Sequence, residues 1–386
     1  MERRSAGMRF GWAIHLFLVG NLLAGCAHNA EQERAEAQRL AEEKAAQEAA
    51  EKAKAEAKRQ EALEADLFGP PKSWEDVAGK YEFECPVPNY TLEQPHAVKV
   101  GAHQFWIHGA LLEKEGDSDR KEWRIGVLGA IKDATEPTQK NLKKAAEIFA
   151  KQGVDFVIVN GDLADQFDDL KGVFDLLASN FDIPMLVFPG NVDPVNGFNR
   201  NFMRVSPEHP NIFNMMWHHH LKWGKLHLFV VPGYHNKDFS QPGACIYRDK
   251  HIELLDELMT DSKNMGEFYA LAAHGPPRGE GRYDLDYAAG GGNVGDERLA
   301  ELISKHNVRL GLFSHILEAG ANAKTSMDKA SKFTFPMKSH VENFYVNVGA
   351  SSGMPWDLNN GRLSQGMAAV VHIHLEQGIK TDLIRF

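Results

Sequence analysis

The feature that most constrains the fold is a regular alternation, beginning at residue 124, between short apolar runs and longer amphipathic stretches. The apolar runs have the length of strands and lie at residues 124–128, 156–159, 184–188, 226–231, 269–273, 308–313 and 344–348. The amphipathic stretches have helical periodicity and lie at residues 138–151, 169–178, 251–259 and 296–306. Strands that alternate with helices predict an α/β fold built in layers.

Four of the apolar runs are followed by a residue that can bind a metal ion. The segments "NGDLAD", "PGNVDP", "AAHGPP" and "FSHILEAG" place Asp162, Asn191, His274 and His315 at the carboxyl ends of their strands. In open α/β sheets, ligands bind at this edge. One Gly-Asp or Gly-Asn pair is an ordinary turn, and one histidine after a strand is usually a core or surface residue. Four such residues in a single pattern are hard to assign to turns and predict a binding site.

The same segments carry a family resemblance. In order, "GDLAD", "GNVD", "HGPP" and "SHIL" resemble the last four motifs of the calcineurin-like metallophosphoesterase family. The family pattern is D-x-H, G-D-x-x-D, G-N-H-[DE], a histidine before small or proline residues, and G-H-x-H. The resemblance covers residues 124–386. It implies a layered metallophosphoesterase-like β-sandwich flanked by helices, with a site for two metal ions that hydrolyses phosphoesters.

The sequence departs from the family pattern at one of the two implied metal sites. Where the first motif has its aspartate and histidine, this chain has Ala130 and Lys132. Where the fifth motif has its glycine and last histidine, this chain has Ser314 and Leu317, and the histidine of the third motif is Val192. By the resemblance, the first metal therefore loses all of its ligands except the aspartate that bridges both ions.

The implied ligands of the second metal are all retained. They are Asp162, Asn191, His274 and His315. One carboxylate, one amide oxygen and two imidazoles suit a borderline divalent ion such as zinc or manganese. We therefore expect one divalent metal and no second one. The alternative is that these side chains are kept for hydrogen bonding after metal binding was lost.

Three neighbouring residues are candidates to compensate for the lost ligands. Asp133 and Glu318 each lie one residue past a vacant ligand position, but an offset of one residue turns an extended side chain to the opposite face. Lys132 itself is a candidate catalytic residue, because an ammonium can replace part of the missing metal's charge and attract a phosphate. The alternative interpretation is that Lys132 is a solvated lysine on the surface.

The losses leave three classes of function open. Replacing a catalytic histidine typically lowers the rate by about 10²- to 10⁴-fold. Losing one of two metals removes several further kcal/mol of transition-state stabilisation. The first class is a binding module, or pseudoenzyme, that holds a phosphorylated ligand or an envelope protein. The second is a hydrolase with one metal and altered catalytic groups. The third is a structural envelope lipoprotein.

The N-terminus predicts a lipoprotein signal peptide over residues 1–25. Three arginines precede a mostly apolar stretch at residues 10–24, which is too short for a comfortable membrane span. The following "LAGC" resembles the bacterial lipobox, in which the cysteine, here Cys26, receives the lipid. An ordinary signal peptide with a chance cysteine is the alternative. By resemblance, the absence of aspartate at Ala27 favours the outer membrane, so we expect a lipid-anchored envelope protein that faces the periplasm.

Residues 26–72 are expected to form a spacer between the anchor and the folded part. Residues 31–66 are almost entirely Ala, Glu, Lys, Arg and Gln, which favour helix, and they lack the apolar repeat of a coiled coil. We expect residues 73–123 to add a β element to the main domain at residues 124–386. The net charge of -10 and the absence of a basic block in the folded part exclude a nucleic-acid partner.

Two cysteines remain besides Cys26, and they are Cys85 and Cys245. In an oxidising compartment they are able to form one disulfide. Buried free cysteines are also common, and the sequence does not show how close the two Cα atoms come.

Lipidation is testable in cells. A radioactive fatty acid should label the protein, and Cys26→Ala should abolish the label, because the thiol is the acceptor. An unlabelled wild-type protein would contradict the anchor.

Overall fold

The computed structural model describes residues 38–47, 49–55, 84–87, 95–166, 169–262, 266–331 and 333–386. The chain divides into two compact units, Met1–Gly69 and Pro70–Phe386. In the first unit, residues 38–47 and 49–55 are helical, as the composition predicts. The signal peptide and Cys26 lie outside the described residues. Within the described part of the chain, no helix has the length and apolar character that crossing a membrane requires.

The second unit contains two large sheets. In spatial order, the larger, ten-stranded sheet consists of β1 (His96–Val100), β2 (His103–His108), β3 (Leu111–Lys114), β8 (His220–Trp223), β9 (Leu226–Val231), β10 (Phe268–Ala273), β13 (Leu310–Phe313), β16 (Phe344–Asn347), β14 (Ala323–Ser326) and β15 (Lys329–Ser331). The six-stranded sheet consists of β20 (Gly378–Arg385), β19 (Met367–His374), β4 (Glu122–Gly129), β5 (Phe156–Asn160), β6 (Met185–Phe188) and β7 (Ile212–Asn214).

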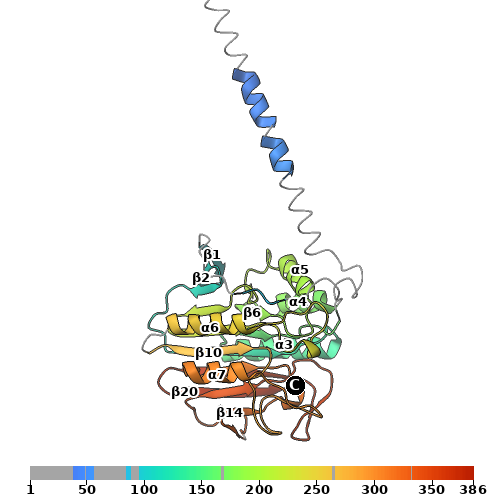
Figure 1. Cartoon of the computed structure of the whole chain (residues 1–386), viewed down its shortest axis with the longest axis vertical. Coiled ribbons are helices and arrows are strands. Elements are labelled where there is room, and N and C mark those ends of the chain that lie inside the picture. The colour runs from blue at the N-terminus through green and yellow to red at the C-terminus, as the bar shows by residue number, and fades with distance from the viewer. Residues whose placement is uncertain are drawn as a thin grey trace, which may run out of the picture. The chain divides into compact units, whose positions relative to one another are not determined.

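The two sheets pack face to face with helices on both outer faces (Figure 1). A large apolar core lies between the sheets and includes Trp123, Phe156 and Trp223. A second core joins the six-stranded sheet to α3 (Glu136–Gln152), α4 (Asp169–Asn180) and α5 (Val195–Val205). A third joins the ten-stranded sheet to α6 (Asp249–Asp261) and α7 (Glu297–His306). The predicted α/β sandwich flanked by helices is therefore confirmed.

Local sequence signals explain where the flanking helices begin and end. Helix α3 has a proline in its first turn and ends at Gly153, which has the left-handed φ of 63° that glycine tolerates best. Helix α7 begins after Asp296, whose side chain accepts a hydrogen bond from the backbone N–H of Arg298. It ends at Asn307, which is also left-handed. These ends return the chain to the sheets and fix the loops between strands.

The segment before the main domain extends the larger sheet. Strands β1, β2 and β3 form an antiparallel meander, and β3 pairs in parallel with β8. Farther upstream, Cys85 is bonded to Cys245, with Cα atoms 4.8 Å apart. The backbone N–H of Cys85 also donates to the carbonyl of Ile246 at 2.9 Å. The disulfide therefore ties residues 84–87 to the folded domain.

The central strands of both sheets run in parallel and end at one edge of the sandwich. In one sheet β4, β5 and β6 pair in parallel, and in the other β9, β10, β13 and β16 do so. The loops that follow β5, β6, β10 and β13 carry the predicted ligands. The remaining short elements are β11 (Tyr287–Ala288), β12 (Gly292–Asn293), β17 (Trp356–Asp357), β18 (Leu363–Ser364), η1 (Lys237–Phe239) and η2 (Leu317–Ala319).

Candidate metal centre

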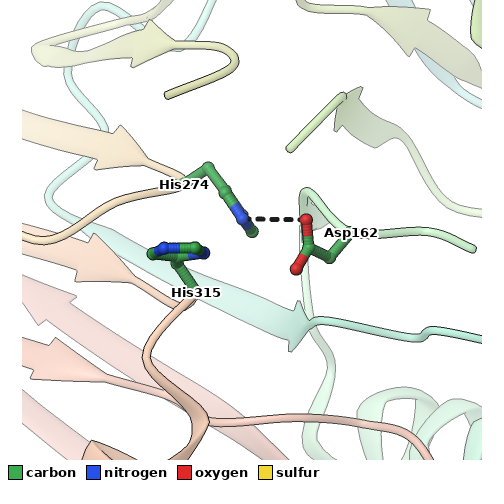
Figure 2. A group of neighbouring side chains, drawn as sticks. All are labelled: Asp162, His274 and His315. Carbon is green, nitrogen blue, oxygen red and sulfur yellow. Dashed lines mark ion pairs between the residues drawn. The ribbon is translucent and has the colours of Figure 1, made fainter. Parts of the chain in front are cut away.

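The four predicted metal ligands lie at this edge of the sandwich. Asp162, Asn191 and His274 are buried, and His315 is half-buried. One ligand atom from each of Asp162, His274 and His315 lies within 4.8 Å of the others. Figure 2 shows the two imidazole rings and the carboxylate facing one another from loops that follow three different strands. Within the described residues, no other cluster of histidine, cysteine and acidic side chains meets this criterion.

His274 has a contact at each ring nitrogen. Its Nδ1 lies 3.2 Å from the backbone carbonyl of Asn160. Its Nε2 lies 3.0 Å from Oδ1 of Asp162 and 2.9 Å from Oδ1 of Asn191. When Nδ1–H donates to the carbonyl, the lone pair of Nε2 points toward the other ligands, which is the usual arrangement of a metal-binding histidine. A charged imidazolium that donates from both nitrogens also fits these contacts. That arrangement is expected if these side chains are kept for hydrogen bonding and no longer bind a metal.

Asn191 and His315 favour the metal. The amide nitrogen of Asn191 donates to the carbonyl of Phe239, which directs its Oδ1 into the cluster. Nδ1 of His315 is buried and has no hydrogen-bond partner among the described residues. An unpartnered buried nitrogen costs about 1–3 kcal/mol, and a metal ion beside the ring compensates for such a cost. The donor set therefore fits one borderline divalent ion.

Asp162 is ionised although it is almost completely buried, with 1% of its surface exposed. Burial alone would raise its pKa, but attraction to His274, when that imidazole is protonated, and to the ammonium of Lys132 outweighs this effect and holds the pKa well below its usual value. Oδ2 accepts from Nζ of Lys132 at 2.7 Å, and Oδ1 accepts from the backbone N–H of Val192 at 3.3 Å. Each carboxylate oxygen therefore has its own set of contacts.

Lys132 is a buried, paired residue rather than a solvated one. Its side chain is 14% exposed, and its ammonium also lies 3.0 Å from Asp165. Burial would lower the pKa of Lys132, but the charges of Asp162 and Asp165 raise it above its usual value. The backbone N–H of Lys132 donates to the carbonyl of Asp162 at 3.0 Å, so the two loops are also joined through their main chains. The ammonium of Lys132 therefore holds a positive charge beside one oxygen of Asp162.

Left-handed backbone conformations occur at three residues of this cluster. The φ angles are 71° at Lys132, 53° at Asp162 and 54° at His315. A residue with a side chain rarely adopts this conformation, and the strain persists only where surrounding contacts enforce it. The loops are therefore shaped to bring these side chains together.

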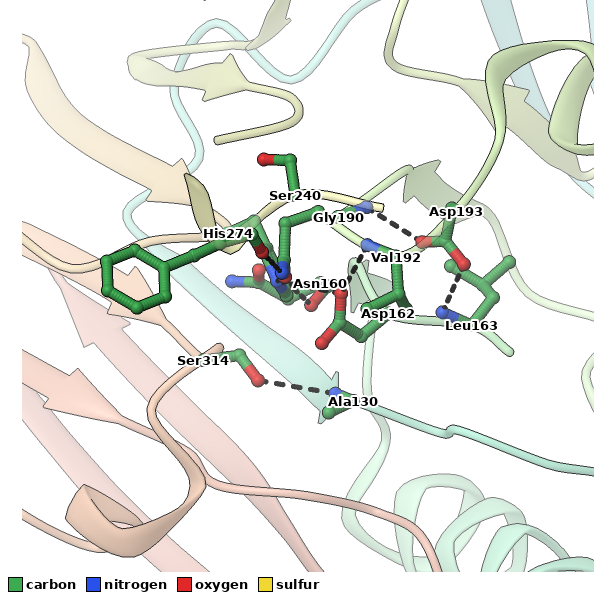
Figure 3. A network of polar contacts seen from close by, with 12 residues as sticks. Ala130, Asn160, Asp162, Leu163, Gly190, Val192, Asp193, Ser240, His274 and Ser314 are labelled. Carbon is green, nitrogen blue, oxygen red and sulfur yellow. Dashed lines mark hydrogen bonds and ion pairs between the residues drawn. The ribbon is translucent and has the colours of Figure 1, made fainter. Parts of the chain in front are cut away.

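Apolar residues fill the other vacant ligand positions. Ala130, Leu317 and Ala350 are buried and contact one another. Figure 3 shows the backbone N–H of Ala130 directed at Oγ of Ser314, with a separation of 3.2 Å. A small apolar cluster therefore lies where, by the family resemblance, two ligands of a first metal would be.

Asp133 and Glu318 do not restore those ligands. The carboxylate of Asp133 accepts hydrogen bonds from Thr135, Thr138 and Ser352, which use both of its oxygens. Glu318 is absent from the ligand cluster of the described residues. Both observations agree with the offset argument from the sequence.

Asp193 positions the site, although the sequence analysis does not single it out. It is fully buried, and Figure 3 shows that it accepts hydrogen bonds from the backbone N–H groups of Gly190, at 2.7 Å, and Leu163, at 2.8 Å. A third comes from the backbone N–H of Ala164 at 3.2 Å. Burial, followed by repulsion from Asp162, raises the pKa of Asp193 to about 6. Asp193 joins the loops that carry Asp162 and Asn191. The available signal was its place as the last residue of "GNVD".

Two buried asparagines hold the other loops. The side-chain amide of Asn160 donates to the carbonyls of Ala273 and Leu312, at 3.1 and 3.0 Å, and so connects the two sheets. The amide of Asn347 donates to the carbonyls of Ser314 and Ile316 on either side of His315, both at 2.9 Å. These side chains fix where the two histidine loops begin.

Comparison with known proteins places the chain in a family. The calcineurin-like phosphoesterase family matches residues 124–319, so the chain belongs to this family, whose members bind divalent metals. A comparison with curated proteins gives no match.

Comparison with solved structures finds matches at low sequence identity. A protein from Thermus thermophilus is 18% identical, with a TM-score of 0.43 and coverage of 68% of this chain and 99% of the other. GAP50, the anchor in the inner membrane complex of Plasmodium, is 14% identical, with a TM-score of 0.45 and coverage of 69% and 85%. A dimetal phosphatase from Danio rerio is 10% identical, with a TM-score of 0.42 and coverage of 68% and 99%.

Replacing Lys132 tests its pairing with Asp162. Lys132→Met should lower the free energy of unfolding of the metal-free protein by about 3–5 kcal/mol, because it leaves a buried carboxylate without its cation. The double variant Lys132→Met/Asp162→Asn should lose less free energy of unfolding than the two single variants lose in sum. Lys140→Met removes a lysine that is 74% exposed and should change stability by less than about 0.5 kcal/mol. A Lys132→Met protein as stable as the wild type in urea unfolding would contradict the pairing.

Metal content tests the donor set. After loading with zinc or manganese and dialysis, elemental analysis should find one metal per chain, and His274→Ala or His315→Ala should reduce it sharply. His340→Ala removes an exposed histidine outside the cluster and should leave the content unchanged. Two metals per chain would show that the first site is rebuilt, and none would support the hydrogen-bonding alternative.

Proposed function

We propose that the protein is a lipid-anchored member of this family that holds a phosphorylated ligand at a site with one metal and does not hydrolyse it efficiently. The observation that carries the proposal is the ammonium of Lys132, which lies 2.7 Å from Oδ2 of Asp162. By the family resemblance, this oxygen would otherwise face the first metal. A fixed organic cation then takes the place of one metal ion.

The charges of the cluster suit a phosphate ligand. Lys132, Asp162 and Asp165 together carry one negative charge, so a divalent ion held by Asp162, Asn191, His274 and His315 would make this group of residues net positive. When bound, such an ion supplies a Lewis acid that polarises a phosphoryl oxygen. The ammonium of Lys132 can add electrostatic attraction to a second oxygen. Binding is therefore supported by two positive centres.

The same residues give poor support for hydrolysis. An ammonium donates hydrogen bonds but has no empty coordination position, so it cannot activate a water molecule as a second metal does. The side chain of Val192, at the position of the family's third-motif histidine, has no proton to give. The ring of Tyr234 contacts that of His315 in a tilted arrangement, with centroids 4.1 Å apart, but its hydroxyl donates to the carbonyl of Val294 at 3.0 Å. Its proton therefore points at the main chain rather than at a leaving group.

The proposed location is the bacterial cell envelope, with the folded domain tethered through Cys26, in our proposal to the outer membrane on the periplasmic side. Its support is the lipobox-like "LAGC" and the helical segments at residues 38–47 and 49–55. The bond between Cys85 and Cys245 agrees with an oxidising compartment. The partner we propose is an envelope protein that carries a phosphorylated group.

Restoring the family ligands tests the loss of catalysis. The wild-type protein with manganese should give little or no turnover of a chromogenic phosphodiester. The quadruple variant Ala130→Asp, Lys132→His, Val192→His and Leu317→His should bind a second metal and hydrolyse this substrate. Single restorations should gain almost nothing, because the missing groups act as a unit.

A wild-type rate that Asp162→Ala abolishes would overturn the proposal in favour of a one-metal hydrolase. To separate binding from structural support, Asp162→Ala/His274→Ala should fail to restore the wild-type phenotype in a strain that lacks the gene. A protein that restores the phenotype despite those changes, but fails to do so when the spacer is deleted, would instead indicate a structural lipoprotein.

A further inference from the structure

A cavity lies outside the metal centre. It has a volume of about 380 Å³, and its lining combines aromatic side chains with two arginines: Tyr283, Phe333, Phe335, Arg362 and Arg385. Asn322 and Asn360 add amide groups to the lining. None of the described ligand atoms of the metal cluster lines this cavity. Its volume lies within the range of small-molecule sites, which combine apolar walls with a few polar groups.

Two of the lining residues, Arg362 and Arg385, carry positive charges. Within the described part of the chain, neither guanidinium forms an ion pair with a carboxylate, and Arg385 has only the sulfur of Met367, at 3.4 Å, as a hydrogen-bond acceptor. The pKa of Arg385 is lowered by partial burial and then by the nearby positive charge of Arg362. Two like charges that face one cavity repel each other, so an anion between them would relieve the repulsion and accept several hydrogen bonds.

The aromatic walls give the cavity its second property. Phe333 and Phe335 are partly buried and pack against the core between the sheets. Their rings lie 6.4 Å apart, and each also contacts the ring of Phe344. Because these rings are held by the core, they form a fixed apolar surface beside the arginines. An inorganic anion would use the arginines but leave this surface exposed to water.

Strand register places the cavity at the same edge of the sandwich as the metal centre. Strand β14 begins beside the end of β16, where Ala323 pairs with Val346. Strand β20 ends beside the start of β19, where Arg385 pairs with Met367, and β19 begins beside the end of β4. Strands β16 and β4 both run parallel to strands whose loops carry metal ligands. The cavity is therefore on the ligand-binding edge, at its β14–β20 side.

We propose that this cavity is a second ligand site, which binds a small organic anion bearing an aromatic or other apolar group. Arg362 and Arg385 bind the anionic group, and Phe333 and Phe335 contact the apolar part. The site acts independently of the metal centre, because its arginines and rings do not touch the metal ligands.

The test uses benzenesulfonate, a probe that a phosphoesterase cannot hydrolyse, with the full-length protein in the presence of a chelator. Ligand-observed NMR should detect binding below about 10 mM, and benzyl alcohol, which lacks the charge, should bind more weakly. Arg362→Gln/Arg385→Gln should weaken benzenesulfonate binding by about 10-fold or more, because both charge-assisted contacts are lost. Both arginines are exposed, so the substitutions should leave the unfolding transition unchanged.

Two variants control for other sites. Arg200→Gln removes an exposed arginine on α5 that does not line the cavity, and it should leave binding unchanged. His274→Ala should also leave it unchanged, since the metal centre is not involved. The proposal is overturned if the wild type does not bind, if the double arginine variant binds as the wild type does, or if His274→Ala abolishes binding. The last result would place the probe at the metal centre.

Discussion

Asp162 carries its charge almost entirely out of water, and Lys132 supplies the cation that this burial requires. A lone buried carboxylate would take up a proton or weaken the fold, whereas the paired one stays ionised and keeps its other oxygen directed toward His274. The geometry of the cluster depends on one oxygen of Asp162 contacting Lys132 while the other contacts His274. Ala130 and Leu317, at the neighbouring positions, form a small apolar cluster with Ala350 and add no charge that would need a partner.

Buried polar side chains around the ion pair hold the loops of the site in place. Asn160 connects the two sheets, Asp193 connects the loops after β5 and β6, and Asn347 holds the loop of His315. Each buried polar side chain bonds to several main-chain groups, so moving one loop would break hydrogen bonds in another. The left-handed residues Lys132, Asp162 and His315 remain in place for the same reason. The site is thus prearranged for a ligand rather than assembled by one.

The sequence predicts the layered fold and the positions of the four candidate ligands because strongly apolar runs mark the central strands. The predicted strands stop at residue 348, so β19 and β20 are missed. Strand β20 carries polar residues such as Lys380 and Asp382 within its span, whereas β19 contains an apolar run that did mark a strand. Helix α5 is missed because Gly197 and several asparagines lower its helical propensity. The direction of the Lys132 side chain depends on a left-handed turn, which spacing along the chain cannot reveal. The role of Asp193 depends on main-chain groups in another loop, and residue type alone carries no sign of them.

Anomalous diffraction from crystals of the protein grown with manganese tests the one-metal site most directly. We predict one manganese ion per chain, bonded to Asp162, Asn191, His274 and His315, with the ammonium of Lys132 still beside the other oxygen of Asp162. Two anomalous peaks about 3.5–4 Å apart that share Asp162, with Lys132 turned away, would contradict this prediction. Such a pair would mean that the chain builds the two-metal centre of a hydrolase by ligands other than those described.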